Sequence, residues 1–174
     1  IFYKTVDMAT YQSTGHSSWK DPNTGHLLPN TFIMLPTNTP PQQIILVKYT
    51  DLKNNEIGPF EYHFNAEQHV AIAQREMLNM TKNAWLMLRD FDGATLIYFS
   101  QLASSRCAIK RIQYSLDSDK LDQAFTLPPC DTRDPFAIPD GFDSYLRVDK
   151  PIQFVTVQVT YFDQTQSSIE TYRQ

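Results

Sequence analysis

The segment 152–162 constrains the fold most, because valine and tyrosine alternate in it with threonine and glutamine. Side chains of a β-strand point alternately to its two faces, so this pattern predicts a strand with one buried and one solvated face. The inward set is Val155, Val157, Val159 and Tyr161, and the outward set is Phe154, Thr156, Gln158 and Thr160. Antiparallel sheets commonly have this arrangement.

Most of the remaining chain is also strand-like. Further strands are expected at 1–3, 31–35, 43–49, 57–64, 84–90, 94–101, 109–116, 145–148 and 168–172. One helix stands out, because apolar residues recur at spacings of three and four from Ala66 to Met80, after Asn65 as a candidate N-cap. We therefore predict a mainly β protein, an antiparallel β-sandwich that is immunoglobulin-like in its second half, with one amphipathic helix near 66–80.

Two organisations are compatible with this order of elements. In the first, residues 1–104 form a β-rich half with the helix, and residues 105–174 form the immunoglobulin-like half. In the second, the 174 residues form one continuous domain.

Composition excludes several classes of protein. The 15 lysines and arginines are scattered among 19 acidic residues, so the basic patch of a nucleic-acid-binding protein is missing. The longest apolar runs, 44–47 and 84–88, are far shorter than the ~18 residues of a membrane span. We expect no nucleic-acid partner and no membrane span within this chain.

Cys107 and Cys130 form an even pair. The turn-rich stretch between them suits a single disulfide in an oxidising compartment, although two buried thiols would have the same sequence. The chain begins at Ile1 without a leader pattern, so we expect a processed mature chain or a part of a longer one, with a periplasmic or extracellular location.

Residues Ile112–Asp117 and Val155–Ser167 together resemble the immunoglobulin-like module at the C-terminus of chitobiases and hexosaminidases. The resemblance covers about residues 109–172, but Ser118 and Gln164 replace the glycines usual in the module. It implies an accessory β-sandwich and carries over no catalytic residue.

No catalytic or metal-binding motif is present. The four histidines, His16, His26, His63 and His69, lack the spacings of metal sites, and we expect no metal and no cofactor. Asp117, Asp119 and Asp122 could supply oxygen ligands to Ca²⁺, but they lack the spacing of a calcium loop, which favours turn aspartates.

The stretch Tyr11–Asn30 is the candidate binding loop, because nearly twenty residues in it show no periodicity. Tyr11, His16, Trp19 and His26 offer flat rings for stacking on a sugar or a peptide side chain. The alternative is that Trp19 anchors the loop to the core.

The sequence favours a non-catalytic binding or assembly module of an exported or membrane-anchored protein of bacterial type. Its ligand would be a protein partner or a glycan. The alternative is a hydrolase that uses His63 or His69 with neighbouring carboxylates. A pocket with a hydrogen bond between histidine and carboxylate would favour the enzyme, and a flat aromatic surface or an open sheet edge would favour binding.

Overall fold

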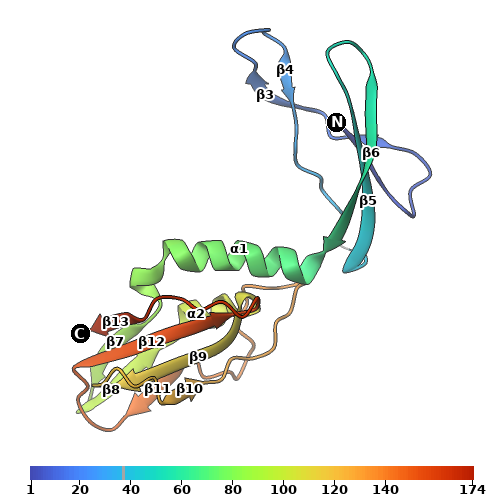
Figure 1. Cartoon of the computed structure of the whole chain (residues 1–174). Helices are drawn as coiled ribbons and strands as arrows, with labels where there is room; N and C mark the ends of the chain where they lie inside the picture. Colours follow the sequence, from blue (N-terminus) through green and yellow to red (C-terminus); the bar gives the residue numbers. More distant parts are fainter. Residues whose placement is uncertain (37) are drawn as a thin grey trace. The chain divides into compact units, whose positions relative to one another are not determined.

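The computed structural model of the chain describes residues 1–36 and 38–174, which are mainly antiparallel β-sheet (Figure 1). They form two compact units, residues 1–66 and residues 67–174. This division differs from the predicted boundary after residue 104. The reason is that β8 (Ala94–Tyr98) pairs with β11 (Tyr145–Val148), so strands from both sides of residue 104 share one sheet.

The first unit contains a four-stranded sheet and a separate hairpin. The sheet has the order β2-β1-β5-β6, with bounds Gln12–Ser13, Phe2–Thr5, Gln42–Thr50 and Glu56–Asn65. The hairpin pairs β3 (His16–Lys20) with β4 (Leu27–Pro29). Between β5 and β6, the Asp51 carboxylate accepts hydrogen bonds from the main-chain N–H groups of Lys53 and Asn55, each at 2.8 Å. An aspartate that bonds its own turn is a common way to close a hairpin.

The first unit has a small core. Among its described residues, only Thr5 and Ile45 are buried, and they face each other across the β1–β5 ladder. All other described side chains of this unit are half-buried or exposed.

The second unit is a sandwich of two antiparallel sheets with helices at one side (Figure 1). One sheet has the order β11-β8-β7 and the other the order β10-β9-β12-β13. The remaining bounds are Met87–Phe91 for β7, Ile109–Leu116 for β9, Gln123–Phe125 for β10, Phe154–Tyr161 for β12 and Glu170–Arg173 for β13.

This strand order is immunoglobulin-like, as predicted for the second half. In chain order, the first, second and fifth strands of the unit (β7, β8 and β11) form one sheet. The third, sixth and seventh strands (β9, β12 and β13) are neighbours in the other sheet, as in an immunoglobulin domain. The fourth strand, β10, lies beside the third. The sandwich begins at β7, earlier than predicted, because its second sheet requires β7 and β8.

The core of the second unit lies between the two sheets. The rings of Phe99 and Phe125 stack with their centroids 4.0 Å apart, and Tyr114 packs edge-on against Phe99 at 5.5 Å. The predicted inward face of β12 contributes Val155, Val157, Val159 and Tyr161, all buried. This confirms the alternation in 152–162 as the signal of a core strand.

The predicted helix is confirmed as α1 (Ala66–Met80). Its buried residues are Ala71, Gln74 and Leu78. The buried indole of Trp85 donates a hydrogen bond to the carbonyl oxygen of Leu78 at 2.9 Å, which anchors the end of the helix. None of the helices in the described residues has the length and hydropathy that a membrane span requires.

Short helical segments escaped the sequence analysis. These are α2 (Ser100–Ser104), η1 (Lys82–Ala84) and η2 (Arg106–Ala108). Segments of three to five residues are too short to show the helical period.

Two local predictions in the first unit are wrong. The described residues of the segment 31–36 contain no strand, because the Asn30 side-chain oxygen accepts a hydrogen bond from the N–H of Phe32 at 3.0 Å and turns the chain. The segment Tyr11–Asn30 is not an irregular loop, since it contains β2, β3 and β4.

The predicted outward position of Thr156 is also wrong. Thr156 is 0% exposed, and its hydroxyl contacts the Ser115 hydroxyl at 2.6 Å and donates to the Ser118 carbonyl at 2.7 Å. The turn that follows β9 therefore covers this part of β12. The turn between β9 and β10 thus buries Thr156, which the alternation of residues in β12 predicted to be exposed to solvent.

Candidate functional site

The four predicted binding residues lie in two places of the first unit. His16 and Trp19 are on β3, and His26 immediately precedes its partner strand β4; all three are exposed. Trp19 is 75% exposed, so the alternative that it anchors the segment to the core is wrong. Main-chain N–H groups of Asn23 and Thr24 bond the Asp21 carboxylate at the tip of this hairpin, and they lower its pKa.

Tyr11 directly precedes β2, an edge strand of the four-stranded sheet. The ammonium groups of Lys4 and Lys48 lie 5.2 Å and 4.3 Å from the centroid of its ring. Lys48 also forms an ion pair with Glu56 at 2.6 Å. Tyr11 is therefore half-buried between cations, an arrangement that holds the ring in place.

Most of the exposed apolar surface around the hairpin was not predicted from the sequence. Phe32 is 78% exposed and Met34 is 86% exposed, and both directly follow the hairpin. Leu27 and Leu28 on β4 are exposed as well. The signal in the sequence was the run of large apolar residues between 27 and 35 within a polar stretch, of which residues 31–35 were predicted only as a short strand.

A second exposed apolar group lies on β5 and β6. The rings of Tyr49 and Phe60 are stacked, with their centroids 6.3 Å apart, and both are exposed. β6 is ten residues long and is an edge strand of its sheet. Long edge strands with apolar side chains are sites where other chains pair with a sheet, and proteins usually protect them.

A pocket of about 450 Å³ opens beside β1 in the same unit. Its wall includes Tyr3, Met8 and Met34, and the Tyr3 hydroxyl donates to the Met34 carbonyl at 3.4 Å. The only charged residue among those that line it is Asp7.

The hydrolase hypothesis depended on His63 and His69. His63 is on β6, opposite Ile44, and His69 is on α1 in the second unit. Both are exposed, and they line neither the pocket beside β1 nor the pocket described below. No group of three or more metal-ligating side chains occurs within the described part of the chain.

Asp117, one of the three candidate calcium ligands, uses its carboxylate to bond the main chain. One carboxylate oxygen of Asp117 accepts hydrogen bonds from the main-chain N–H groups of Gln153 and Phe154, at 2.8 Å and 3.1 Å. Asp131 accepts from the N–H of Arg133 at 3.0 Å, and this bond together with the Arg133 guanidinium lowers its pKa. The Asp131 contact has the geometry of a turn, whereas the Asp117 contacts join the residue after β9 to the start of β12.

The disulfide between Cys107 and Cys130 is present, as one of the two alternatives predicted. β9 and β10 pair in a register that places Ile112 opposite Phe125, and continuing that register by five residues places Cys107 opposite Cys130. Between these ends the ladder is interrupted. Pro128 and Pro129 cannot donate the hydrogen bonds that a ladder needs.

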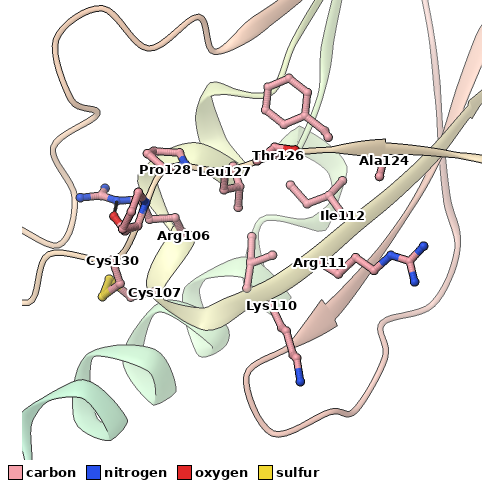
Figure 2. A pocket seen from close by; sticks show the side chains of 13 residues that line it. Arg106, Cys107, Lys110, Arg111, Ile112, Ala124, Thr126, Leu127, Pro128 and Cys130 are labelled. Atoms are coloured by element: carbon pink, nitrogen blue, oxygen red, sulfur yellow. Dashed lines mark hydrogen bonds between the residues drawn. A yellow bond between two sulfur atoms is a disulfide. The ribbon is translucent and has the colours of Figure 1, made fainter.

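A pocket of about 370 Å³ opens where the ladder is interrupted (Figure 2). We call it the disulfide pocket. It is lined by Arg106, Cys107, residues 109–112 and residues 124–130. In Figure 2, Ile112 and Leu127 lie within it, and the side chains of Lys110 and Arg111 extend outward from β9 at its rim.

Arg106 closes one end of the disulfide pocket. It is 4% exposed, and its guanidinium donates to the carbonyl oxygens of Pro129, Pro135 and Ala137 at 2.8, 3.3 and 2.6 Å. The sequence offered no signal for this arrangement, because the carbonyl groups come from a loop more than twenty residues away. Arg106 and the disulfide together hold residues 129–137 against the sandwich.

Comparison of the chain with known protein families, curated proteins and solved structures finds no match. The features of the molecule that point to a function are the exposed apolar surface of the first unit and the disulfide pocket of the second.

Proposed function

We propose that this chain is a non-catalytic binding module whose first unit docks onto a protein partner. One observation carries the proposal. Seventeen large apolar side chains among the described residues are exposed, and ten of them belong to residues 1–66. A unit that buries so little and exposes so much apolar surface gains stability when a partner covers that surface.

The chemistry of this surface favours a protein over a glycan. The exposed residues include aliphatic side chains and methionine beside the aromatic rings, namely Leu27, Leu28 and Met34 with Trp19 and Phe32. Aromatic residues and methionine are enriched at protein interfaces. A glycan, which is covered with hydroxyl groups, would leave the leucines and the methionine without a suitable contact.

Low charge supports the same proposal. Residues 1–66 contain four lysines, no arginine and five acidic residues, so few charges must lose their hydration when a partner binds. The long edge strand β6 adds main-chain groups with which an extended segment of the partner can pair.

The second unit has the role of an accessory sandwich in this proposal. The sheet β10-β9-β12-β13 spans the residues that resemble the chitobiase C-terminal module, and such a module presents something else and performs no reaction. The disulfide is compatible with an oxidising compartment, which supports a periplasmic or extracellular location for the whole chain.

Site-specific photocrosslinking tests the proposal in the cells that produce the protein. A photoreactive phenylalanine analogue replaces Trp19 or Phe32 in the first unit, and Arg89, an exposed residue of β7, as the control position. We expect one discrete protein adduct from the first two positions and none from the control. Equal labelling from all three positions, or adducts with the mass of a saccharide, would reject a protein partner at this surface.

A further inference from the structure

We propose that the disulfide pocket binds a carboxylate that carries an apolar body. The proposal is independent of the proposed function, because the pocket lies entirely within the second unit. Its volume of about 370 Å³ is at the lower end of ligand-binding pockets, which span roughly 300–1,000 Å³.

Positive charge at the pocket is the first argument. Its lining contains Arg106, Lys110 and Arg111 and no acidic residue. Lys110 donates to the neutral side-chain oxygen of Gln164 at 2.8 Å, and Arg111 has no ion-pair partner in the described part of the chain. The nearest acidic residue in sequence, Asp131, is already bonded to Arg133 at 3.3 Å. An anion is therefore attracted to this rim.

Hydrogen-bond donors are the second argument. Thr126 and Leu127 lie in the interrupted part of the ladder, and within the described residues their main-chain N–H groups have no main-chain acceptor. Both residues line the pocket. A carboxylate accepts such hydrogen bonds readily, and bonds to an ionised acceptor are stronger than those to a neutral one.

The apolar floor defines the rest of the ligand. Ile109, Ile112, Leu127 and Pro128 contribute hydrocarbon surface, and Phe125 lies at the end where the ladder resumes. An apolar group on the ligand covers this floor while its carboxylate stays at the basic rim. A small organic acid and the apolar C-terminal residue of a peptide share this chemistry.

Titration of the whole chain followed by NMR of its main-chain amides tests the proposal. The first pair of probes is 3-phenylpropionate and its neutral amide. The second pair is N-acetyl-Gly-Phe with a free C-terminus and the same dipeptide with an amide C-terminus. We expect saturable shifts at Thr126 and Leu127 with the two carboxylates and none with the two amides. The tighter carboxylate identifies the source as a free acid or a peptide terminus.

Charge-removing variants sharpen the test. Arg111→Gln and Lys110→Gln should each weaken carboxylate binding by about tenfold, the effect of losing a charged hydrogen-bond donor. Lys120→Gln removes an exposed charge outside the pocket lining and should leave binding unchanged. No saturable shift at millimolar probe, equal binding of carboxylate and amide, or equal loss in all three variants overturns the proposal.

Discussion

The side chain of Gln74 bonds the main chain of Cys107: its Oε1 accepts a hydrogen bond from the Cys107 N–H at 2.9 Å. Its Nε2 donates to the carbonyl oxygens of Ser104 at 3.3 Å and Pro135 at 2.9 Å. Gln74 is 0% exposed. A single buried amide therefore joins α1, the first residue of the disulfide and the loop that follows the second.

Replacing this amide with a hydrocarbon should destabilise the second unit. Gln74→Leu removes the partners of the Cys107 N–H and the Ser104 carbonyl in a buried site and leaves the Pro135 carbonyl with Arg106 alone, and we expect a loss of about 2–4 kcal/mol in the free energy of unfolding. Urea denaturation followed by circular dichroism measures it. Glu76→Leu, at an exposed position of the same helix, is the control and should change stability by less than ~0.5 kcal/mol. Equal effects of the two variants would contradict the role of Gln74.

The disulfide should stabilise the chain by restricting its unfolded state. The two cysteines are 23 residues apart, and closing a loop of this length contributes about 3 kcal/mol. We expect the double variant Cys107→Ala, Cys130→Ala to lose this amount and to be insensitive to reductant, whereas the parent protein should lose it only when reduced. Alkylation without reductant, followed by mass spectrometry, must find no labelled thiol in protein from its native compartment.

The two tryptophans should respond oppositely to truncation. Trp19 is 75% exposed, so Trp19→Ala should change stability by less than ~0.5 kcal/mol while weakening partner binding by ~1–3 kcal/mol. Trp85 is 0% exposed and bonds Leu78, so Trp85→Ala should cost ~3–5 kcal/mol of stability. Urea melts of both variants decide this before any partner is known. A large loss of stability in Trp19→Ala would remove this residue from the binding surface.

Tyr114, Tyr161 and Tyr172 are buried and have a raised pKa, so the second unit should be sensitive to alkaline pH. Burial raises the pKa of Tyr161 and of Tyr172, and Glu170 raises both further. Their hydroxyls bond Asn79 and the main chain of Lys82. Because the folded-state pKa values exceed those of the unfolded chain, this stabilisation is complete below roughly pH 10 and declines as the pH rises above it.

The measurement is the free energy of unfolding between pH 8 and pH 11. We expect a plateau followed by a decline that is smaller in Tyr172→Phe, since this variant lacks one of the titrating groups. A decline of the same size in the variant would assign the alkaline sensitivity to other residues.

Calcium should have no effect on stability. The Asp117 carboxylate already accepts two main-chain hydrogen bonds from Gln153 and Phe154, so it is engaged in joining two segments of the sandwich. A ligand that binds only the folded state must raise the melting temperature, and we therefore expect the same Tm in chelator and in millimolar calcium chloride. A rise with calcium would reassign Asp117, Asp119 and Asp122 as metal ligands.

The sequence predicted well those elements in which the spacing of apolar residues along the chain matches the face that is buried in the structure. β12 alternates because one of its faces meets the core, and α1 repeats at three and four because one of its faces is buried. The prediction of a strand at 31–35 was wrong. The Phe32 N–H donates a hydrogen bond to the Asn30 side chain, which turns the chain, and these apolar residues pair with no sheet.

The candidate sites were predicted less completely. Trp19 and its neighbours on the hairpin were identified as candidates from their residue types. Their exposure could not be predicted, because aromatic residues occur both in cores and on surfaces. The sequence contains one local indication of the disulfide pocket. Pro128 and Pro129 lack the N–H groups that a β-ladder needs, so a ladder cannot continue there. Nothing local indicated that Arg106 would meet the carbonyl groups of residues 129–137.

By itself the sequence determined the β class of this protein, its one long helix and the availability of one cysteine pair, because propensity, period and composition are properties of neighbouring residues. The tertiary structure alone decided that Thr156 is buried, that Trp19 is exposed, and that the interrupted ladder between Cys107 and Cys130 encloses a basic pocket. Each of these depends on segments that are distant in the chain and meet only when the sheets form, since burial is set by what packs against a residue.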